Sequence, residues 1–459
     1  MDSGAPEAER DWVSFTRALA SDAYGGSIRL DARIATPPKD EHPGRWRQRR
    51  PGGDGLDAEQ RALIARLEAI GYAQGSQPAV ERTGVVVHAR GLVQPGYNFY
   101  TSGHAAEAFL TDLEGNVLHR WAYPFERAFP ERKRALSSPS AHSWRRARLY
   151  ENGDVVAIYE GLGLVRIDAD SNLLWARFNH AHHDLEAQPN GDIYVLTRRA
   201  HVVSAVDRRL PILEDSISIL GPDGEAKSEI SLLDVFENSA PAHAWRPASR
   251  AFWASESSGG LVGHRGPGDF FHTNSLRVLE GDLSVPGFQA GNILVSFCHL
   301  NRIAVIDPRT MRAVWSVDGL TRLQHDPVVT PDGGILVFDN HWRPGLHSRV
   351  VELDPRTGAV VWQYAGTEDA PLYSRSCGTA APLANGNVLI TESDNGRALE
   401  ITRDGEVVWE FYNPHVAGKE DEFIATLFDL VRLPANFPME WAERPGEGVG
   451  ARSSVTGSR

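Results

Sequence analysis

The sequence predicts an all-β fold: a six-bladed β-propeller with an N-terminal helical or irregular extension and a short C-terminal cap. Two observations predict it. Runs of β-branched and aromatic residues alternate with Asn-Gly, Asp-Gly or Asp-Pro-x-Thr turns along most of the chain, and such turns are strong signals of a β-hairpin. Several hairpins end on a tryptophan, and Trp315, Trp362 and Trp409 lie 47 residues apart, which is the length of one propeller blade.

Residues 1–83 do not share this pattern and are assigned to the N-terminal extension. Residues 45–55 read RWRQRRPGGDG, a basic segment punctuated by glycine and proline that we expect to be a solvated linker. A helix is predicted to begin at Asp57, an acidic N-cap with a glutamine three residues later, and to end at Gly71. Its apolar residues recur at helical spacing, so we expect one face to pack on the main domain.

The hairpins pair into six blade-sized units over residues 84–415. The predicted units are 146–177, 184–232, 275–317, 325–364 and 379–412, with a sixth built around 85–122. A β-sandwich or a solenoid is the weaker alternative, because sandwiches do not repeat a tryptophan-terminated hairpin pair so regularly. Residues 416–459 are predicted to cap one face of the propeller and to end in a disordered tail.

Composition narrows the classes of partner. A net charge of −13 with a pI of about 5.7 argues against a nucleic-acid surface or an anionic membrane, since both require a basic face. No run of 18 apolar residues is present, and the N-terminus is acidic and polar, so we expect a cytoplasmic protein, or a periplasmic one if a leader has been removed. The expected partner is a small, aromatic molecule, and the sequence does not indicate an oligomeric state.

Propeller geometry converts sequence spacing into a predicted site. The innermost strand of each blade lines the central channel, so residues just before these strands meet at one mouth of it. His183 lies seven residues before Asn190 of its turn, and His325 lies seven residues before Asp332. The two histidines therefore occupy equivalent positions in different blades. His272 stands three residues before the first strand of the blade between them.

Both cysteines belong to the same predicted site. Cys377 lies eight residues before Asn385, one residue away from the histidine spacing, and Cys298 follows the strand NILVSF where the chain turns outward. At most one disulfide could form from two cysteines. We expect five residues to converge in one channel: His183, His272, His325, Cys298 and Cys377.

Six segments of the sequence resemble the arylsulfotransferase family over roughly residues 90–415. They read HHDLEAQPNGDIYVLTR, FHTNS, RIAVIDPRT, QHDPVVTPDGGILVFDN, LANGNVLITES and GEVVWEFYNP. The resemblance implies a six-bladed propeller, in agreement with the repeat. It also implies transfer of a sulfuryl group from an aryl sulfate to a phenol by a ping-pong route, without a cofactor or a nucleotide sulfate donor.

Carried over by motif, the resemblance implies that His325 is the transiently sulfated nucleophile. It implies that His183 and His272 orient the sulfate and the phenolic oxygen. The chemistry is sound, because a neutral imidazole is a competent nucleophile near pH 7 and a second histidine can serve as general acid to the leaving phenolate. The residues expected to bind substrate are Asn274, Arg302, Arg322 and His299.

The sequence departs from the family pattern at two positions. Members usually carry an arginine where this chain has Cys298, and many carry another where it has Cys377. A thiol cannot supply the cationic donors that sulfuryl oxygens need. The alternative function is therefore a metal-dependent propeller enzyme, such as an oxidoreductase, because thiolates and imidazoles suit copper or zinc. Its predicted ligands are Cys298, Cys377, His183, His272 and His325; a redox disulfide or a non-catalytic binding propeller also remains open.

Overall fold

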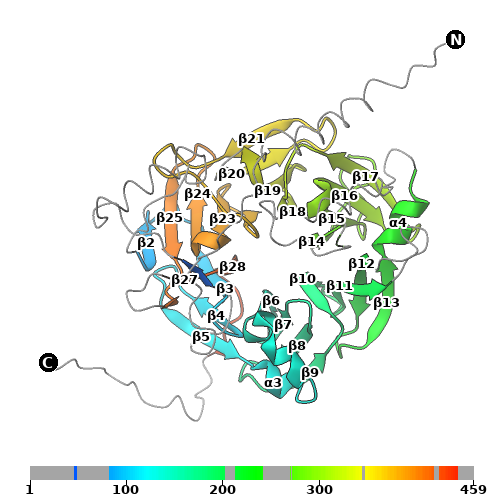
Figure 1. Ribbon diagram of the computed structural model, residues 1–459. Helices are drawn as coiled ribbons and strands as arrows, with labels where there is room; N and C mark the ends of the chain where they lie inside the picture. The colour runs from blue at the N-terminus through cyan, green and yellow to red at the C-terminus, as the bar shows by residue number, and fades with distance from the viewer. Residues whose placement is uncertain are drawn as a thin grey trace, which may run out of the picture.

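The computed structural model describes residues 46–48, 82–201, 212–240, 269, 271–343, 347–417 and 423–442. Six antiparallel sheets of four or five strands stand side by side around a central axis, as Figure 1 shows. The predicted all-β, six-bladed propeller is confirmed. The described α-helices are short, α3 (Phe125–Ala128) and α4 (Leu232–Asn238), and neither has the length and hydropathy that crossing a membrane requires.

Four blades are each built from four consecutive strands, and they match the predicted units closely. The first is β6 (Arg146–Leu149), β7 (Val155–Tyr159), β8 (Gly163–Ile167) and β9 (Leu173–Arg177). The second is β10 (Ala181–Ala187), β11 (Ile193–His201), β12 (Ile212–Leu220) and β13 (Ala226–Ser231). The third is β14 (Thr273–Val278), β15 (Ile293–Phe297), β16 (Arg302–Asp307) and β17 (Arg312–Asp318). The fourth is β18 (His325–Val329), β19 (Ile335–Arg343), β20 (His347–Leu353) and β21 (Val360–Tyr364).

The last two blades combine strands from both ends of the chain. One contains β22 (Thr379–Pro382), β23 (Val388–Glu392), β24 (Arg397–Ile401), β25 (Val407–Tyr412) and, on its outer edge, β2 (Gly84–His88). The other contains β28 (Leu427–Pro434), β3 (Gly96–Ser102), β4 (Glu107–Thr111) and β5 (Val117–Ala122). Pairing β28 with β3 gives the sixth blade its inner strand and covers the edge of β3. The propeller therefore extends past the boundary predicted at residue 415, and β2 belongs to the neighbouring blade.

A small sheet lies outside the six blades. It contains β1 (Trp46–Gln48), β27 (Phe423–Ala425) and β26 (Val416–Ala417). Part of the segment expected to be a solvated linker, residues 45–55, is thus a strand, because β27 supplies hydrogen-bond partners for it. The helix predicted from Asp57 lies outside the described residues.

Buried ion pairs link the inner strands around the axis. The Arg146 guanidinium lies 3.1 Å from Asp184, 3.2 Å from Asp326 and 2.6 Å from Asp429. Arg277 pairs with Asp184 at 2.5 Å and also with Asp326. Together with Arg148, which pairs with Asp429 at 3.1 Å, these residues are called the channel cluster below. A buried charge is stable only when it is paired, so the cluster holds the inner strands of five blades in fixed relative positions.

Candidate active site

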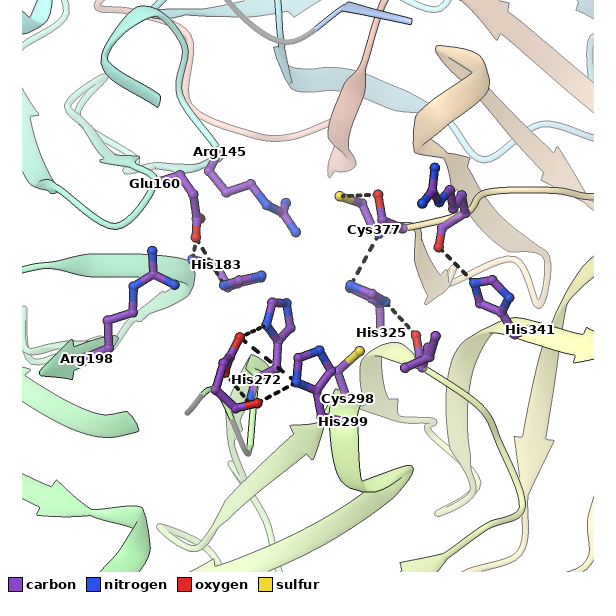
Figure 2. A pocket seen from close by; sticks show the side chains of 14 residues that line it. Arg145, Glu160, His183, Arg198, His272, Cys298, His299, His325, His341 and Cys377 are labelled. Carbon is purple, nitrogen blue, oxygen red and sulfur yellow. Dashed lines mark hydrogen bonds and ion pairs between the residues drawn. The ribbon is translucent and has the colours of Figure 1, made fainter. Parts of the chain in front are cut away.

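One cavity of about 250 Å³ opens beside the channel cluster, and Figure 2 shows the side chains that face it. The structure brings together in its lining every histidine and cysteine that the sequence was expected to gather there, and it adds residues that the sequence analysis did not single out. The lining consists of Arg145, Glu160, His183, Arg198, Asp269, His272, Cys298, His299, Leu323, His325, His341, Arg375, Ser376 and Cys377.

Register along the inner strands explains the convergence. His183 and His325 each directly precede an aspartate of the channel cluster, and Arg145 directly precedes its Arg146. Arg145 also lies seven residues before Asn152, the same spacing that identified the two histidines. The first blade therefore presents a guanidinium where the second and fourth blades present imidazoles, and this spacing could have revealed it.

Four lining residues sit in the left-handed backbone region that L-residues avoid. The φ angles of His183, His272, Leu323 and Cys377 are 53°, 45°, 50° and 61°. Such conformations cost roughly 1–3 kcal/mol each and persist where surrounding contacts impose them. Here the His183 N–H donates to Glu160 at 2.8 Å and the His272 N–H donates to Asp269 at 3.2 Å. The strained backbone aims these side chains into the cavity.

The neighbours of His325 determine its tautomer. Its Nδ1 faces two acceptors, the Leu323 carbonyl at 3.0 Å and the Asn340 Oδ1 at 2.8 Å, while its Nε2 faces the Cys377 N–H at 3.2 Å. Asn340 is held in this orientation because its Nδ2 donates to the carbonyls of Ser374 and Cys377. Only an imidazole protonated on Nδ1 satisfies all these contacts. Burial, with a contribution from the Arg145 charge, lowers the pKa of His325 to about 3, so the ring is neutral.

His272 has the opposite character. Its Nδ1 lies 2.6 Å from the Asp269 carboxylate, and its ring stacks on that of His299 with centroids 4.3 Å apart. His299 in turn donates from Nδ1 to the Asp269 carbonyl at 2.8 Å. Burial alone would lower the pKa of His272, but the hydrogen bond and charge of Asp269 raise it above its ordinary value. His272 therefore carries a proton more readily than His325 does.

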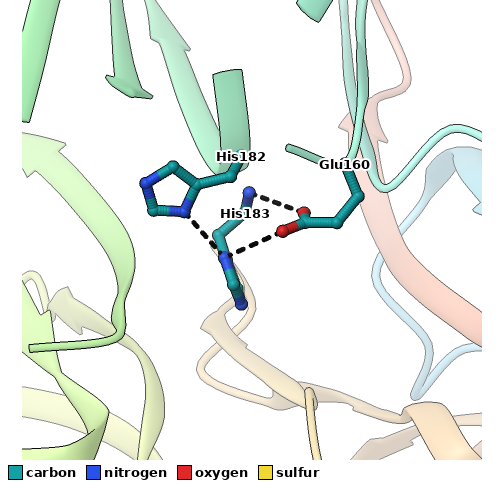
Figure 3. Close-up of side chains that lie close together, drawn as sticks. All are labelled: Glu160, His182 and His183. Carbon is teal, nitrogen blue, oxygen red and sulfur yellow. Dashed lines mark hydrogen bonds and ion pairs between the residues drawn. The ribbon is translucent and has the colours of Figure 1, made fainter. Parts of the chain in front are cut away.

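His183 is a neutral imidazole held by Glu160 and His182, as Figure 3 shows. Its Nδ1 lies 3.3 Å from Glu160 and 2.9 Å from the Nδ1 of His182. Burial and the positive charges of neighbouring groups hold the pKa of His183 well below its ordinary value. Its ring lies edge-on to His272, with centroids 4.8 Å apart. The second and third blades thus meet through these two rings.

Three arginines line the cavity in a protein that is acidic as a whole: Arg145, Arg198 and Arg375. Arg145 is only 4% exposed, and its Nη1 has no hydrogen-bond partner among the described residues. A buried cationic donor without a partner is costly unless a ligand satisfies it. The cavity is therefore suited to an anion, and Arg145 of the first blade supplies a positive charge there.

Of the residues predicted to bind substrate, only His299 lines the cavity. Asn274 is buried and donates to the Gln324 carbonyl at 2.7 Å. Arg302, the first residue of β16, pairs with Asp318 at 2.6 Å. The Arg322 side chain is absent from the described lining. Asn274, Arg302 and Arg322 lie close in sequence to residues of the cavity, but their side chains do not line it.

Both cysteines are buried thiols in the cavity wall. Figure 2 shows Cys298 beside His299 and Cys377 beyond His325. Two groups of described residues place three candidate ligand atoms within 4.8 Å of one another, Glu160 with His182 and His183, and Asp269 with His272 and His299. Neither group contains a cysteine, and the ligand set predicted around Cys298 and Cys377 stays a prediction. Three guanidinium groups in the same wall disfavour a bound cation.

Comparison with known proteins identifies a family and several distant structural neighbours. Residues 147–414 match the family described as arylsulfotransferase (ASST). No curated protein matches the chain. A crystal structure of a protein of unknown function from Bacteroides caccae is 13% identical, with a TM-score of 0.43, covering 69% of this chain and 94% of that one.

Two lyase structures show a similarly distant likeness. A streptogramin B lyase is 11% identical with a TM-score of 0.40, covering 78% of this chain and 96% of that one. A virginiamycin B lyase from Staphylococcus aureus is 10% identical with a TM-score of 0.37, covering 75% and 98%. Likenesses this weak carry no argument about activity. The family match is different, because it spans more than half of the sequence and includes every lining residue from Glu160 to Cys377. The chain belongs to the arylsulfotransferase family.

Proposed function

We propose that this protein transfers a sulfuryl group from an aryl sulfate to a phenolic acceptor through a covalent intermediate on His325. The observation that carries the proposal is the hydrogen bonding of two histidines in one cavity. The His325 Nδ1–H is held by Asn340 and Leu323, which leaves the Nε2 lone pair on the side of Cys377. Nδ1 of His272 is held by Asp269. One ring is prepared to attack and the other to deliver a proton.

In the first half-reaction, Nε2 of His325 attacks the sulfur of the donor. An N–S bond forms, the bond between sulfur and the aryl oxygen breaks, and the electron pair leaves with the phenolate. The 3.2 Å contact with the Cys377 N–H is long for a hydrogen bond, and it must open before Nε2 can attack. The released N–H can then donate to a sulfuryl oxygen as negative charge develops there.

His272 donates a proton in the first half-reaction and accepts one in the second. The protonated ring gives a proton to the leaving phenolate, and the phenol departs. An acceptor phenol then gives its proton to His272 while its oxygen attacks sulfur, so the N–S bond breaks and His325 returns to its neutral state. Neighbouring groups move the pKa values of His325 and His272 in opposite directions, as acid–base pairs in active sites require.

Arg145 is proposed to hold the sulfuryl oxygens. Its buried Nη1 without a partner is the donor that an anionic SO₃ group would satisfy, and charge-assisted hydrogen bonds of this kind are roughly twice as strong as neutral ones. His183, neutral and fixed by Glu160, is proposed to orient the donor oxygen. No metal takes part in these steps, so turnover should be indifferent to chelators.

The test is a burst experiment with 4-nitrophenyl sulfate in the absence of acceptor. The wild-type protein should release nitrophenolate stoichiometrically with enzyme and gain the mass of one SO₃ group on the peptide that contains His325. His325→Ala should lose the burst, and turnover with added phenol should fall by about 10⁴-fold or more. His347→Ala, which changes a histidine outside the cavity, serves as control. A burst retained by folded His325→Ala would rule out the covalent step.

A further inference from the structure

We propose that the cavity contains a second anion-binding subsite, centred on Arg198, which recognises a carboxylate on the phenolic substrate. This inference rests on the proposed sulfuryl transfer and names the substrate class: phenols and aryl sulfates that carry an acid group away from the reacting oxygen. The position of Arg198, the pairing of the nearby carboxylates and the separation of Arg198 from His325 support it.

The fold makes room for the Arg198 guanidinium at the cavity wall. Arg198 lies in β11 and lines the cavity, and its Nη2 sits against the backbone of Gly161. A Cβ atom at Gly161 would meet that nitrogen, so the guanidinium would have to shift, and the residue has a φ of +71°, which favours glycine. Gly161 therefore lets the guanidinium lie against the backbone at this place.

The carboxylates that line the cavity, Glu160 and Asp269, interact with histidines. Glu160 accepts from the His183 N–H, and Asp269 pairs with His272. Within the described part of the chain, Arg198 forms no ion pair. By contrast, Arg199, the next residue, pairs with Glu214 at 3.5 Å and is 69% exposed. The charge of Arg198 is thus directed at the cavity and is not used to hold the fold together.

Arg198 and the proposed sulfuryl site belong to different ends of the cavity. In Figure 2, Arg198 and His325 lie on opposite sides of the His183 and His272 rings, and Arg145 lies between them above these rings. An SO₃ group bonded to His325 is therefore not the anion that Arg198 holds. A substrate lying across the two rings would place its far end at Arg198.

The chemistry of the wall indicates what that far end carries. The planar fork of arginine matches a carboxylate with two parallel hydrogen bonds. Leu323 is the aliphatic side chain of the described lining, which contains no Phe, Tyr or Trp, so an apolar substituent would find little surface. At about 250 Å³ the cavity is also smaller than those that hold drug-sized ligands. A compact phenolic acid fits this description.

The experiment compares two isosteric acceptors, 4-hydroxyphenylacetate and 4-hydroxyphenylacetamide, which differ in charge and not in shape. Dissociation constants are measured by calorimetry, and kcat/KM is measured with 4-nitrophenyl sulfate as donor. The wild-type protein should favour the acid by about 10- to 100-fold, the range expected for a hydrogen bond to a charged group. Arg198→Gln should bring the ratio of the two acceptors close to one, while transfer to the amide is kept.

Arg199→Gln is the matched control, because the neighbouring side chain points to the other face of the strand. It should keep the preference for the acid, and Arg198→Lys should keep part of it. Equal binding of acid and amide by the wild-type protein would overturn the subsite, whether or not Arg198→Gln folds. Tighter binding of 4-hydroxybenzylphosphonate than of the acid would overturn the assignment to a carboxylate. Absence of turnover with normal discrimination in binding would count against sulfuryl transfer alone.

Discussion

The two histidines at the centre of the cavity show how neighbours give one side chain opposite roles. Burial, helped by the charge of Arg145, lowers the pKa of His325 to about 3, although its hydrogen bonds to Asn340 and Leu323 act in the other direction. His272 is equally enclosed, but the Asp269 carboxylate at 2.6 Å reverses the effect of burial and raises its pKa. Asp269 stays ionised, since its own pKa is lowered to about 2 by His272 despite burial. Burial sets the direction of the shift at His325, whereas the carboxylate of Asp269 sets it at His272.

Replacing Asp269 should move the pH dependence of the reaction. In Asp269→Asn, burial acts on His272 without the carboxylate, so the pKa of His272 should fall below its ordinary value. The proposed mechanism needs His272 protonated for donor cleavage, so the alkaline limb of kcat/KM should shift to lower pH. Its position is measured with 4-nitrophenyl sulfate between about pH 4 and 9. Glu160→Gln, which removes the other carboxylate of the lining, should shift the alkaline limb less. If the alkaline limb of kcat/KM stays at the same pH in Asp269→Asn, His272 is not the general acid.

Tryptophans near the outer edge of several blades join them to the next blade. The indole Nε1 of Trp409 on β25 donates to the Leu113 carbonyl at 2.9 Å, in the turn of the following blade. Trp315 and Trp362 make the same bond to Pro355 and Arg403, at 2.9 and 2.8 Å. The 47-residue spacing of these tryptophans therefore reflects a repeated contact between neighbouring blades.

Burial should decide how much each tryptophan bond contributes. Trp409 is fully buried, so Trp409→Phe keeps most of the apolar contact but leaves the Leu113 carbonyl without its donor. We expect a loss of about 1–3 kcal/mol in the free energy of unfolding, measured by urea denaturation. Trp362 is half-buried, but its hydrogen bond to Arg403 is exposed to water. Water can replace that bond in Trp362→Phe, so the loss should be under about 1 kcal/mol. Equal losses in the two variants would contradict a role for burial.

The channel cluster acts on the whole molecule because it joins both ends of the propeller. Asp429 comes from the C-terminal strand β28, whereas Arg146 comes from β6 near the start of the ring. Despite their burial, the charges of Arg146 and its neighbours lower the pKa of Asp429, and Arg146 likewise lowers that of Asp184. Burial instead raises the pKa of Asp326. The cluster therefore stabilises the closed ring while the carboxylates of Asp184 and Asp429 stay ionised.

Asp429→Asn should destabilise the ring by about 3–5 kcal/mol, because it leaves Arg146 and Arg148 buried with one carboxylate fewer. Urea unfolding followed by tryptophan fluorescence measures the loss, with the exposed Asp404→Asn as control. Wild-type stability should also fall with acid. The folded pKa of Asp429 and of Asp184 lies below the unfolded value of about 4, so their contribution is complete above that pH and is lost as pH decreases through the folded values. Asp326, whose folded pKa is raised, acts in the opposite direction. If Asp429→Asn were as stable as the wild-type protein, the ion pairs of Asp429 with Arg146 and Arg148 would not hold β28 in place.

Much of the fold followed from the sequence because its signals are local. Hairpin turns, alternating apolar residues and regularly spaced tryptophans are read within one blade, so five units were located almost to the residue. Closure of the ring depends on residues far apart in sequence. Strand β28 pairs with β3 across most of the chain, and no turn next to either strand predicts that pairing. The helix predicted in the N-terminal extension stays a prediction.

The same distinction applies to the site. The sequence by itself determined that His183, His272, His325 and both cysteines lie at one end of the channel, because register along the inner strands sets that end. The same spacing could have revealed Arg145, but only the tertiary structure decided which other cations accompany these residues. Arg198 lies in β11 and lines the cavity, whereas Arg302 pairs with Asp318. The charge of a pocket depends on which side chains find partners elsewhere, and those partners are known only once the chain is folded.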